Sequence, residues 1–301
     1  MIHNAMKEKV CLVTGANAGI GKATTLGLAQ MGATVIMVCR SRQRGQEAQA
    51  EIQAATGNKK IDLLVADLAV PDDIHRLAAT VTADYDSLHI LINNAAIIPQ
   101  QRTLTAAGWE MQWMVNHLAP FLLTNLLLAL LKQSAPARVV TVASQVHANG
   151  RIHFNDLHAT QNYQPSQVYA NTKLANILFT FELARRLAGS GVTANCLHPG
   201  VVATNLLNDY MGVPRQRRDR GIAPTQGAET SLYLAASPEV AGVSGHYFVD
   251  KEKRRATAVA YDEALAAQLW QVSAEMLGLP SLQPHLQKIA TDSDNTTGRN
   301  R

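Results

Sequence analysis

Two side chains four residues apart, Tyr169 and Lys173, could together move a proton. The segment around them, Val-Tyr-Ala-Asn-Thr-Lys-Leu-Ala-Asn-Ile-Leu, has helical sequence, and residues at this spacing share one face of a helix. A phenol with an ordinary pKa of about 10 exchanges its proton poorly at neutral pH, but an adjacent ammonium favours the phenolate and lowers that pKa. The pair predicts a tyrosine that acts as acid or base, although the same spacing is also common on ordinary helix surfaces.

A glycine-rich run near the N-terminus could bind a dinucleotide. Gly15, Gly19 and Gly21 follow a short apolar segment and precede helical sequence. In such a unit the first glycine permits a tight turn, the second lets backbone approach phosphate, and the third lets the helix pack against the strand. The run predicts a pyrophosphate at the N-terminus of the helix that begins near Ile20. A glycine turn without a ligand is the alternative.

Arg40 stands about twenty residues beyond these glycines, where an NAD enzyme usually carries an acidic residue for the ribose 2′-hydroxyl. A guanidinium at this place suits the 2′-phosphate of NADP(H), because it can pair with phosphate in a bidentate manner. We therefore expect NADP(H) as the cofactor, and a solvated arginine at a strand end is the alternative. Asp67 could accept a hydrogen bond from the adenine amino group, or it could simply be a helix N-terminal acid.

These residues need a scaffold that brings strand ends together. Apolar, β-branched runs alternate with helix-length segments, a pattern typical of a parallel sheet covered on both faces. We expect strands near Val10–Thr14, Thr34–Cys39, Ile61–Ala66, Leu88–Ile92, Arg138–Ala143, Val192–Leu197 and His246–Val249. We expect helices near Ile20–Met31, Arg42–Thr56, Asp72–Tyr85, Ala106–Lys132, Gln167–Ala188, Thr225–Ala236 and Ala258–Leu277.

The fold class that follows is α/β, a doubly wound parallel sheet or Rossmann fold, with ligands at the carboxyl ends of the strands. A single domain is expected over residues 1–280, and the polar residues 281–301 are expected to form a mobile tail.

The composition bears on the classes of partner. The 27 basic and 23 acidic residues give a formal net charge of +4 that is spread along the chain, so nucleic-acid binding is not expected. The cysteines Cys11, Cys39 and Cys196 lie in apolar strand-like segments, which predicts core residues in a reducing compartment and no metal site. No apolar signal region precedes Lys7, so a cytoplasmic protein without a membrane anchor is expected.

One uncharged stretch, from Met114 to Leu131, is long enough to suggest a membrane helix. It contains Asn116, His117 and Pro120, and it lies within the regular alternation of strands and helices. Both features favour a helix that is buried by protein.

Further motifs accompany the tyrosine, the lysine and the glycines. Asn93-Asn94-Ala95-Ala96 follows the fourth expected strand, Asn116 lies beyond it, and Ser144 follows the fifth. Together these motifs resemble the short-chain dehydrogenase/reductase family over residues 7–279. Within that family, the chain is similar to the retinol-dehydrogenase-like branch at Val115-Asn116-His117-Leu118, Gly150-Arg151-Ile152-His153-Phe154, Lys173-Leu174-Ala175-Asn176 and Leu269-Trp270. The resemblance implies an NADP(H)-dependent oxidoreductase that interconverts an alcohol and a carbonyl, an aldehyde, ketone or quinone, by hydride transfer.

The resemblance assigns catalytic roles to four residues. It implies that Tyr169 transfers the proton, that Lys173 lowers its pKa and holds the nicotinamide ribose, and that Ser144 polarises the carbonyl. Asn116 would support a water chain to Lys173, or bond backbone within a buried helix, or do both. The 24 residues between Ser144 and Tyr169 exceed the usual family spacing; Ser166 is nearer but lies outside the strand end, so Ser144 is preferred.

The same resemblance implies the cofactor contacts, among them a loop after the sixth strand whose backbone and Thr204 hydroxyl would hold the nicotinamide carboxamide. The residues assigned to the cofactor are Gly15, Asn17, Gly19, Ile20, Gly21, Arg40, Asp67, Leu68, Asn94, Tyr169, Lys173, Pro199, Gly200, Val202 and Thr204. Two positions depart from the family pattern. Ala96 replaces a usual glycine, and Ala119-Pro120 predicts a local kink.

The segment at 206–224 is expected to cover the substrate. It is polar and basic, with Arg215, Arg217, Arg218 and Arg220, which suggests an anionic or polar carbonyl compound; a solvated loop is the alternative. The two long helices expected at 106–132 and 167–188 carry more apolar surface than one sheet face can cover. A homodimer or homotetramer is therefore expected.

Two other functions fit parts of the pattern. A non-catalytic NADP(H)-binding sensor or scaffold would keep the glycines but would not need the set of Asn116, Ser144, Tyr169 and Lys173. A sugar-nucleotide epimerase or dehydratase would normally have a different glycine spacing and a larger substrate domain.

Overall fold

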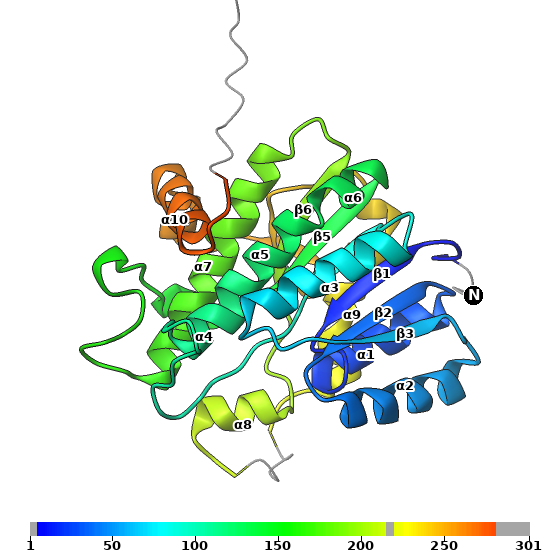
Figure 1. Ribbon diagram of the computed structural model, residues 1–301, viewed down its shortest axis with the longest axis horizontal. Helices are drawn as coiled ribbons and strands as arrows, with labels where there is room; N and C mark the ends of the chain where they lie inside the picture. The colour runs from blue at the N-terminus through cyan, green and yellow to red at the C-terminus, as the bar shows by residue number, and fades with distance from the viewer. Residues whose placement is uncertain (1–4, 215–219, 281–301) are drawn as a thin grey trace, which may run out of the picture.

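The computed structural model describes residues 5–214 and 220–280. The predictions for Arg215, Arg217, Arg218 and the tail at 281–301 lie outside these ranges. Within them, eight strands form a sheet in the order β3-β2-β1-β4-β5-β6-β7-β8, parallel except for the last pair (Figure 1). The strands are β1 (Val10–Thr14), β2 (Thr34–Cys39), β3 (Ile61–Val65), β4 (Ile90–Asn93), β5 (Ala137–Val142), β6 (Val192–His198), β7 (Tyr247–Val249) and β8 (Glu252–Arg254).

Helices cover both faces of this sheet. They are α1 (Gly19–Gln30), α2 (Arg42–Thr56), α3 (Pro71–Asp84), α4 (Met111–Trp113), α5 (Ala119–Leu126), α6 (Leu128–Gln133), α7 (Pro165–Arg186), α8 (Asn205–Met211), α9 (Pro224–Ala236) and α10 (Glu263–Met276). Shorter turns are the π-helix η1 (Met114–Leu118) and the 3₁₀ helices η2 (Gln145–Asn149), η3 (Phe154–Asp156), η4 (Pro238–Val240) and η5 (Ala258–Tyr261).

The side chains of each strand divide between two cores. In β1, Leu12 packs in the core beneath α3, α5, α7 and α10, whereas Cys11 and Val13 pack in the core beneath α1, α2 and α9. In β2, Ile36 joins the first core and Met37 the second. Successive strand residues point to opposite faces, so continuously apolar strands require helices on both sides. The expected doubly wound α/β fold is confirmed.

The single helix expected from Ala106 to Lys132 is wrong. Helical structure begins at Met111, because the carboxylate of Glu110 accepts hydrogen bonds from the backbone N–H groups of Gln112 and Trp113 and so caps the first turn. The path then passes through η1 into α5, and Pro120 in its first turn has no N–H to continue a regular helix. A π-helical turn lies just before Pro120, and the local kink expected there remains a prediction.

The C-terminal helix α10 packs along α7 inside the same chain (Figure 1). Trp270 of α10 stacks on Phe179 of α7 at 5.8 Å and meets Phe121 of α5 edge-on at 4.8 Å, both between ring centroids. Burial of such a ring contributes roughly 2–3 kcal/mol. Much of the apolar surface for which the sequence suggested a partner subunit is therefore covered by α10, and the homo-oligomer remains a prediction on other grounds.

Two elements were not anticipated from the sequence. β8 is a short exposed strand that pairs antiparallel to β7, and α8 is a helix within the segment expected to cover the substrate. The three cysteines are free and buried. No helix in the described ranges combines the length and the apolar character needed to cross a membrane. The uncharged stretch at 114–131 is instead almost wholly buried within the protein.

Candidate active site

The turn between β1 and α1 is packed so closely at Gly15 and Gly21 that a Cβ has no room at either position. A Cβ atom on Gly21 would lie 2.3 Å from the Gly15 carbonyl oxygen and 2.5 Å from Nδ2 of Asn94. Gly15 has a φ of +66°, a conformation that glycine adopts freely and other residues rarely do. The turn therefore presents backbone, with Asn17 and Ile20 partly exposed along it.

Thr14 fixes this turn to the end of β4. Its hydroxyl oxygen accepts hydrogen bonds from the backbone N–H of Asn94 at 3.0 Å and from that of Ala95 at 3.1 Å. Its carbonyl oxygen accepts one from Nδ2 of Asn94 at 2.7 Å. Asn94, assigned to the cofactor, thus forms one wall of the turn. Ala96, beyond it, does not have a positive φ, so the backbone there does not require the glycine usual in the family pattern.

The N-terminus of α1 is suited to an anion. Ala18, at its N-cap, provides no side-chain hydrogen bond, and the first turn contains no acidic residue. The free N–H groups and the helix dipole therefore face the turn uncompensated, as a phosphate site requires. This backbone cradle, which a Cβ would disrupt, fits the pyrophosphate of a dinucleotide.

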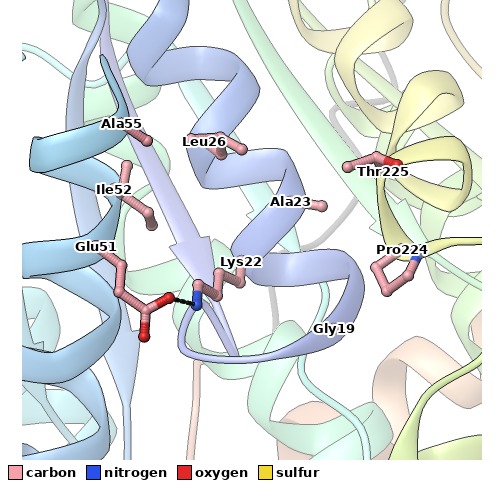
Figure 2. Close-up of a pocket in the computed structure, with 9 residues that line it drawn as sticks. All are labelled: Gly19, Lys22, Ala23, Leu26, Glu51, Ile52, Ala55, Pro224 and Thr225. Atoms are coloured by element: carbon pink, nitrogen blue, oxygen red, sulfur yellow. Dashed lines mark hydrogen bonds and ion pairs between the residues drawn. The ribbon is translucent and has the colours of Figure 1, made fainter. Parts of the chain in front are cut away.

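Lys22, the base nearest to this cradle, is turned away from it. It forms an ion pair with Glu51 of α2 at the edge of a hollow of about 280 Å³, which lies between α1, α2 and the start of α9 and is also lined by Gly19 (Figure 2). The wall of the hollow is mainly aliphatic, and none of the four predicted catalytic residues lines it. Positive charge for a phosphate must therefore come from the helix N-terminus and from other residues.

Arg40 is the residue best placed to supply that charge. It follows β2, its side chain is 75% exposed, and its Nη1 lies 3.9 Å from Oδ2 of Asp67. Asp67 follows β3, and its Oδ1 accepts a hydrogen bond from the backbone N–H of Ala69 at 2.9 Å. Leu68 beside it is partly buried. The two strand ends thus bring Arg40 and Asp67 together at the carboxyl edge of the sheet, and the guanidinium stays open to solvent.

Tyr169 and Lys173 lie one turn apart on α7, and both are almost fully buried, at 7% and 2% exposure. Nζ of Lys173 lies 5.3 Å from the centre of the Tyr169 ring. Burial lowers the pKa of Lys173 to about 7, and it raises the pKa of Tyr169 above its ordinary value. The expected lowering of the tyrosine pKa by the lysine is thus not found. Desolvation of the phenolate dominates, followed by the influence of Tyr210.

Two contacts join α7 to the turn that carries Ser144. Nζ of Lys173 donates a hydrogen bond to the carbonyl oxygen of Val142, the last residue of β5, at 2.8 Å. At the end of η2, a Cβ on Gly150 would lie 2.5 Å from the carbonyl oxygen of Ala170, so the backbone of η2 rests directly on α7. Ser144 stands at the start of η2 and is partly buried, whereas Ser166 is exposed in the first turn of α7.

Asn116 lies in the π-helical turn η1, fully buried. Its side chain bonds both backbone groups of Ile97, with Oδ1 accepting from N at 2.8 Å and Nδ2 donating to O at 3.0 Å. Nδ2 also lies 3.3 Å from Oγ1 of Thr172, which in turn donates to the Tyr169 carbonyl oxygen. The amide is thus occupied with backbone, one of the two roles expected. Residue 120 is proline, so it can donate no i+4 hydrogen bond to the carbonyl of Asn116.

The loop after β6 returns to the glycine turn. A Cβ atom added to Gly19 would lie 3.0 Å from Cγ2 of Thr204. The loop predicted to hold the nicotinamide therefore lies against the turn predicted to hold the pyrophosphate. Oγ1 of Thr204 accepts a hydrogen bond from the backbone N–H of Leu207 and caps α8. The hydroxyl still has its own proton to donate. Pro199 and Gly200 are partly buried, and Val202 is buried.

The segment that follows this loop is closed at its base and carries α8 (Figure 1). The backbone N–H of Ala203 donates to the Ile222 carbonyl at 2.9 Å, and the N–H of Ile222 donates to the Val201 carbonyl at 2.8 Å. Tyr210 of α8 lies against Tyr169, with 5.9 Å between ring centroids. Of the four arginines expected in this segment, Arg220 is in the described range; it is exposed, with Nη1 3.9 Å from Sδ of Met211.

The arrangement brings together a backbone cradle for phosphate, an arginine beside it, and a buried tyrosine and lysine next to Ser144. Such a set can hold a dinucleotide and exchange a proton with a bound oxygen. Sequence reasoning missed Thr14 and Tyr210. Thr14 could have been found from its place at the strand end directly before Gly15, whereas Tyr210 gives no signal within a polar segment.

Known proteins resemble this chain over most of its length. The family model described as short chain dehydrogenase matches residues 9–211. Among curated proteins, retinol dehydrogenase 14 of Mus musculus is 44% identical over 292 residues, which cover 91% of this chain and 87% of the relative.

Solved structures share the fold. An uncharacterized protein from Mycobacterium paratuberculosis has a TM-score of 0.75 at 33% identity, over 91% of this chain and 94% of the other. A short chain dehydrogenase from Burkholderia cenocepacia J2315 in complex with NADP has a TM-score of 0.65 at 25% identity, over 81% and 97%.

Proposed function

The chain belongs to the short-chain dehydrogenase family, in its retinol-dehydrogenase-like branch, and on that basis we propose that it is an NADP(H)-dependent oxidoreductase with a Ser-Tyr-Lys site. It interconverts an alcohol and an aldehyde, ketone or quinone. The observation that carries the proposal is the burial of Tyr169 with Lys173 at the end of the sheet where the glycine turn and the Ser144 turn also lie.

The preference for NADP(H) over NAD(H) rests on Arg40. Its side chain stands exposed at the end of β2, where an acidic residue would favour the ribose 2′-hydroxyl of NAD. Asp67 lies 3.9 Å away, a loose contact between partly exposed groups that contributes little. The guanidinium remains free to pair with a 2′-phosphate, and the Burkholderia relative was solved with NADP.

Tyr169 and Ser144, at the end of the site opposite the 2′-phosphate, act on the substrate oxygen. When bound, the nicotinamide supplies the hydride for carbonyl reduction or accepts it in alcohol oxidation. Tyr169 keeps its proton at neutral pH because burial raises its pKa, which is the state required to protonate a carbonyl oxygen. The hydroxyl of Ser144 donates a hydrogen bond to the same oxygen and polarises the carbonyl.

Lys173 and Asn116 return the proton to Tyr169. With a pKa of about 7, Lys173 changes protonation near neutrality and can exchange a proton with water. The Asn116 carbonyl, to which Pro120 can donate no i+4 hydrogen bond, would accept a hydrogen bond from such a water. The Asn116 amide fixes this turn to Ile97.

The substrate contacts Tyr210. The ring of Tyr210, from α8, lies against the ring of Tyr169, so a substrate that reaches the Tyr169 hydroxyl would lie close to Tyr210. An aromatic wall favours flat, apolar carbonyl compounds, among them retinal, the aldehyde of the substrate named for the relatives. The anionic compound suggested by the four arginines is the competing hypothesis. Neutralising all four should raise the Michaelis constant only if that hypothesis holds.

The test is oxidation of NADPH by the purified protein across a panel of aldehydes, ketones and quinones that includes retinal. Turnover in the wild type that is lost in Tyr169→Phe, with NADPH binding retained in both, is the expected result. Tight NADPH binding with no turnover across the panel would instead favour the sensor or scaffold.

Two further properties belong to this proposal. A homodimer or homotetramer is expected, because members of the family often pair the helices that correspond to residues 106–132 and 167–188. A monomer in light scattering at micromolar concentration would contradict this expectation. The proposed location is the cytoplasm, in keeping with the three buried free cysteines.

A further inference from the structure

A histidine that the proposed reaction does not use, His147, is hydrogen-bonded to the backbone of Ser144. His147 belongs to η2 and is 4% exposed. Its Nδ1 lies 2.7 Å from the carbonyl oxygen of Ser144, and its Nε2 lies 3.1 Å from the backbone nitrogen of Thr257. The ring thus bridges the turn that carries Ser144 and the segment that leads from β8 into η5.

The two partners fix the tautomer of this ring. The backbone N–H of Thr257 can only donate, so Nε2 must accept and carries no proton. In a neutral imidazole the proton is then on Nδ1, where it faces a carbonyl oxygen that can only accept. Neither partner can change its role, because both are backbone groups.

The surroundings keep the ring neutral and in place. Burial lowers the pKa of His147, against the opposing effect of the bond to Ser144. The ring of Tyr247 from β7 meets it edge-on, with 5.1 Å between centroids. His198, at the end of β6, is a second histidine, whose pKa is lowered by burial; the nearby Asp250 opposes this lowering and His147 adds to it. A protonated His147 would lose the bond from Thr257.

We infer that His147 is a positioning residue for Ser144, which it holds by its hydrogen bond to the Ser144 carbonyl while the backbone of Thr257 holds the ring. The inference deepens the proposed function and rests on it. Ser144 is a partly buried residue at the N-cap of the five-residue 3₁₀ helix η2, and its Oγ accepts a long hydrogen bond, 3.4 Å, from the backbone N–H of Val146. The position of the Ser144 side chain is therefore set by the Ser144 backbone, whose carbonyl oxygen is held by the His147 imidazole.

His147 does not exchange protons in the reaction. Both ring nitrogens are engaged with backbone groups, so no nitrogen is left for a substrate or for Tyr169. It acts on the rate only through Ser144, and a small displacement of a polarising donor is enough to change that rate.

Two variants separate the two hydrogen bonds. The amide of asparagine lies about as far from the backbone as Nδ1 does, so His147→Asn can keep the bond to Ser144 and lose the one from Thr257. Glutamine reaches as far as Nε2, so His147→Gln can keep the bond from Thr257 and lose the one to Ser144. Each variant loses one buried hydrogen bond, so similar losses of thermal stability are expected.

The expected result is a difference in kcat between these variants. His147→Gln should lower kcat by about tenfold, the effect of one lost positioning bond, and His147→Asn by about twofold or less. Affinity for NADPH should not change in either. In a Ser144→Ala background, His147→Gln should lower kcat by less than about twofold, because the residue it positions is gone.

Equal losses of kcat in the two variants would overturn the inference, and so would an undiminished effect of His147→Gln in the Ser144→Ala background. Nitrogen-15 NMR of the full chain gives a readout besides activity, with the His147 signals assigned from their loss in His147→Gln. Signals of an Nδ1-protonated ring at neutral pH are expected, and a ring protonated at Nε2 would overturn the assignment.

Failure of the inference can be told from failure of the proposed function. Wild-type protein that turns over no carbonyl compound would remove the proposed function and this inference with it. If the wild type turns over a carbonyl compound but His147→Asn and His147→Gln lose kcat equally, the inference fails and the proposed function stands.

Discussion

The phosphate end and the reaction end of the site are built on opposite principles. At the proposed phosphate end, Gly15, Gly19 and Gly21 keep side chains out, and backbone N–H groups at the start of α1 face the turn. At the proposed reaction end, the proposed chemistry depends on two buried side chains, Tyr169 and Lys173, whose burial shifts the pKa of each. A substitution should therefore act on cofactor binding through backbone shape at one end, and on rate through proton affinity at the other.

The largest effect should come from the reaction end. Tyr169→Phe keeps the ring and its contact with Tyr210 but removes the hydroxyl that donates the proton, so kcat should fall by about a thousandfold. The dissociation constant of NADPH, from fluorescence titration, should change by less than about twofold. If Tyr169→Phe lost NADPH affinity as well as kcat, the two ends of the site would not act separately on binding and on rate.

At the phosphate end, Gly21→Ala should weaken NADPH binding by about 30-fold, because the new Cβ would clash with the Gly15 carbonyl and displace the turn. Lys22→Ala is the matched control, one residue away with its side chain directed at Glu51, and should bind NADPH as the wild type does. Thermal unfolding of both variants shows whether the fold is kept. Wild-type affinity in Gly21→Ala would contradict the backbone-shape account.

Lys173 predicts a pH dependence of stability in the protein without cofactor. Its pKa is lowered to about 7, so between that value and its ordinary value the unfolded chain holds more protons than the folded one. The free energy of unfolding should therefore gain up to about 1.4 kcal/mol per pH unit above pH 7 from this residue. Denaturant titrations should show this slope as a difference between wild type and Lys173→Met, and equal slopes would contradict the burial argument.

Arg40 tests the one side chain on which the phosphate end is proposed to depend. Arg40→Ser should raise the dissociation constant of NADPH about tenfold and leave that of NADH within about twofold, since only NADPH carries the 2′-phosphate. Lys132→Ser, an exposed charge at the end of α6, controls for a general loss of positive charge. Equal losses for both cofactors would sink the proposed preference.

The smallest expected effect concerns α8. Tyr210→Ala should raise the Michaelis constant for an aromatic aldehyde about threefold, because one ring contact is lost, and Tyr210→Phe should match the wild type. Steady-state kinetics with an aromatic and a small aliphatic aldehyde gives the comparison. An equal change for both aldehydes would separate Tyr210 from substrate recognition.

The phosphate end could be predicted from the sequence because its rules are local. Glycines at fixed spacing after an apolar strand need only backbone sterics to explain them, and the strands β1 to β6 follow from continuous apolar runs. The reaction end depends on tertiary surroundings. The raised pKa of Tyr169 comes from burial by elements far apart in the chain, among them Tyr210, which spacing on α7 does not show.

The sequence pattern also did not predict where a continuous helix would be interrupted. The apolar run at 106–132 predicts one helix, but the Glu110 cap, the π-helical turn η1 and Pro120 divide it into shorter pieces. The cover that α10 gives to α5 and α7 depends on Trp270 meeting Phe121 and Phe179, residues that are remote from it in sequence. Such long-range packing decides which apolar faces remain for a partner.

The most direct test of the central claim is isotope transfer from NADPH that carries deuterium at its transferable position. Mass spectrometry of the alcohol formed from the best carbonyl substrate gives the answer. The account predicts one deuterium on the carbinol carbon with wild-type protein, and no product above background with Tyr169→Phe. Unlabelled alcohol, or equal product from the two proteins, would contradict direct hydride transfer at a site that depends on Tyr169.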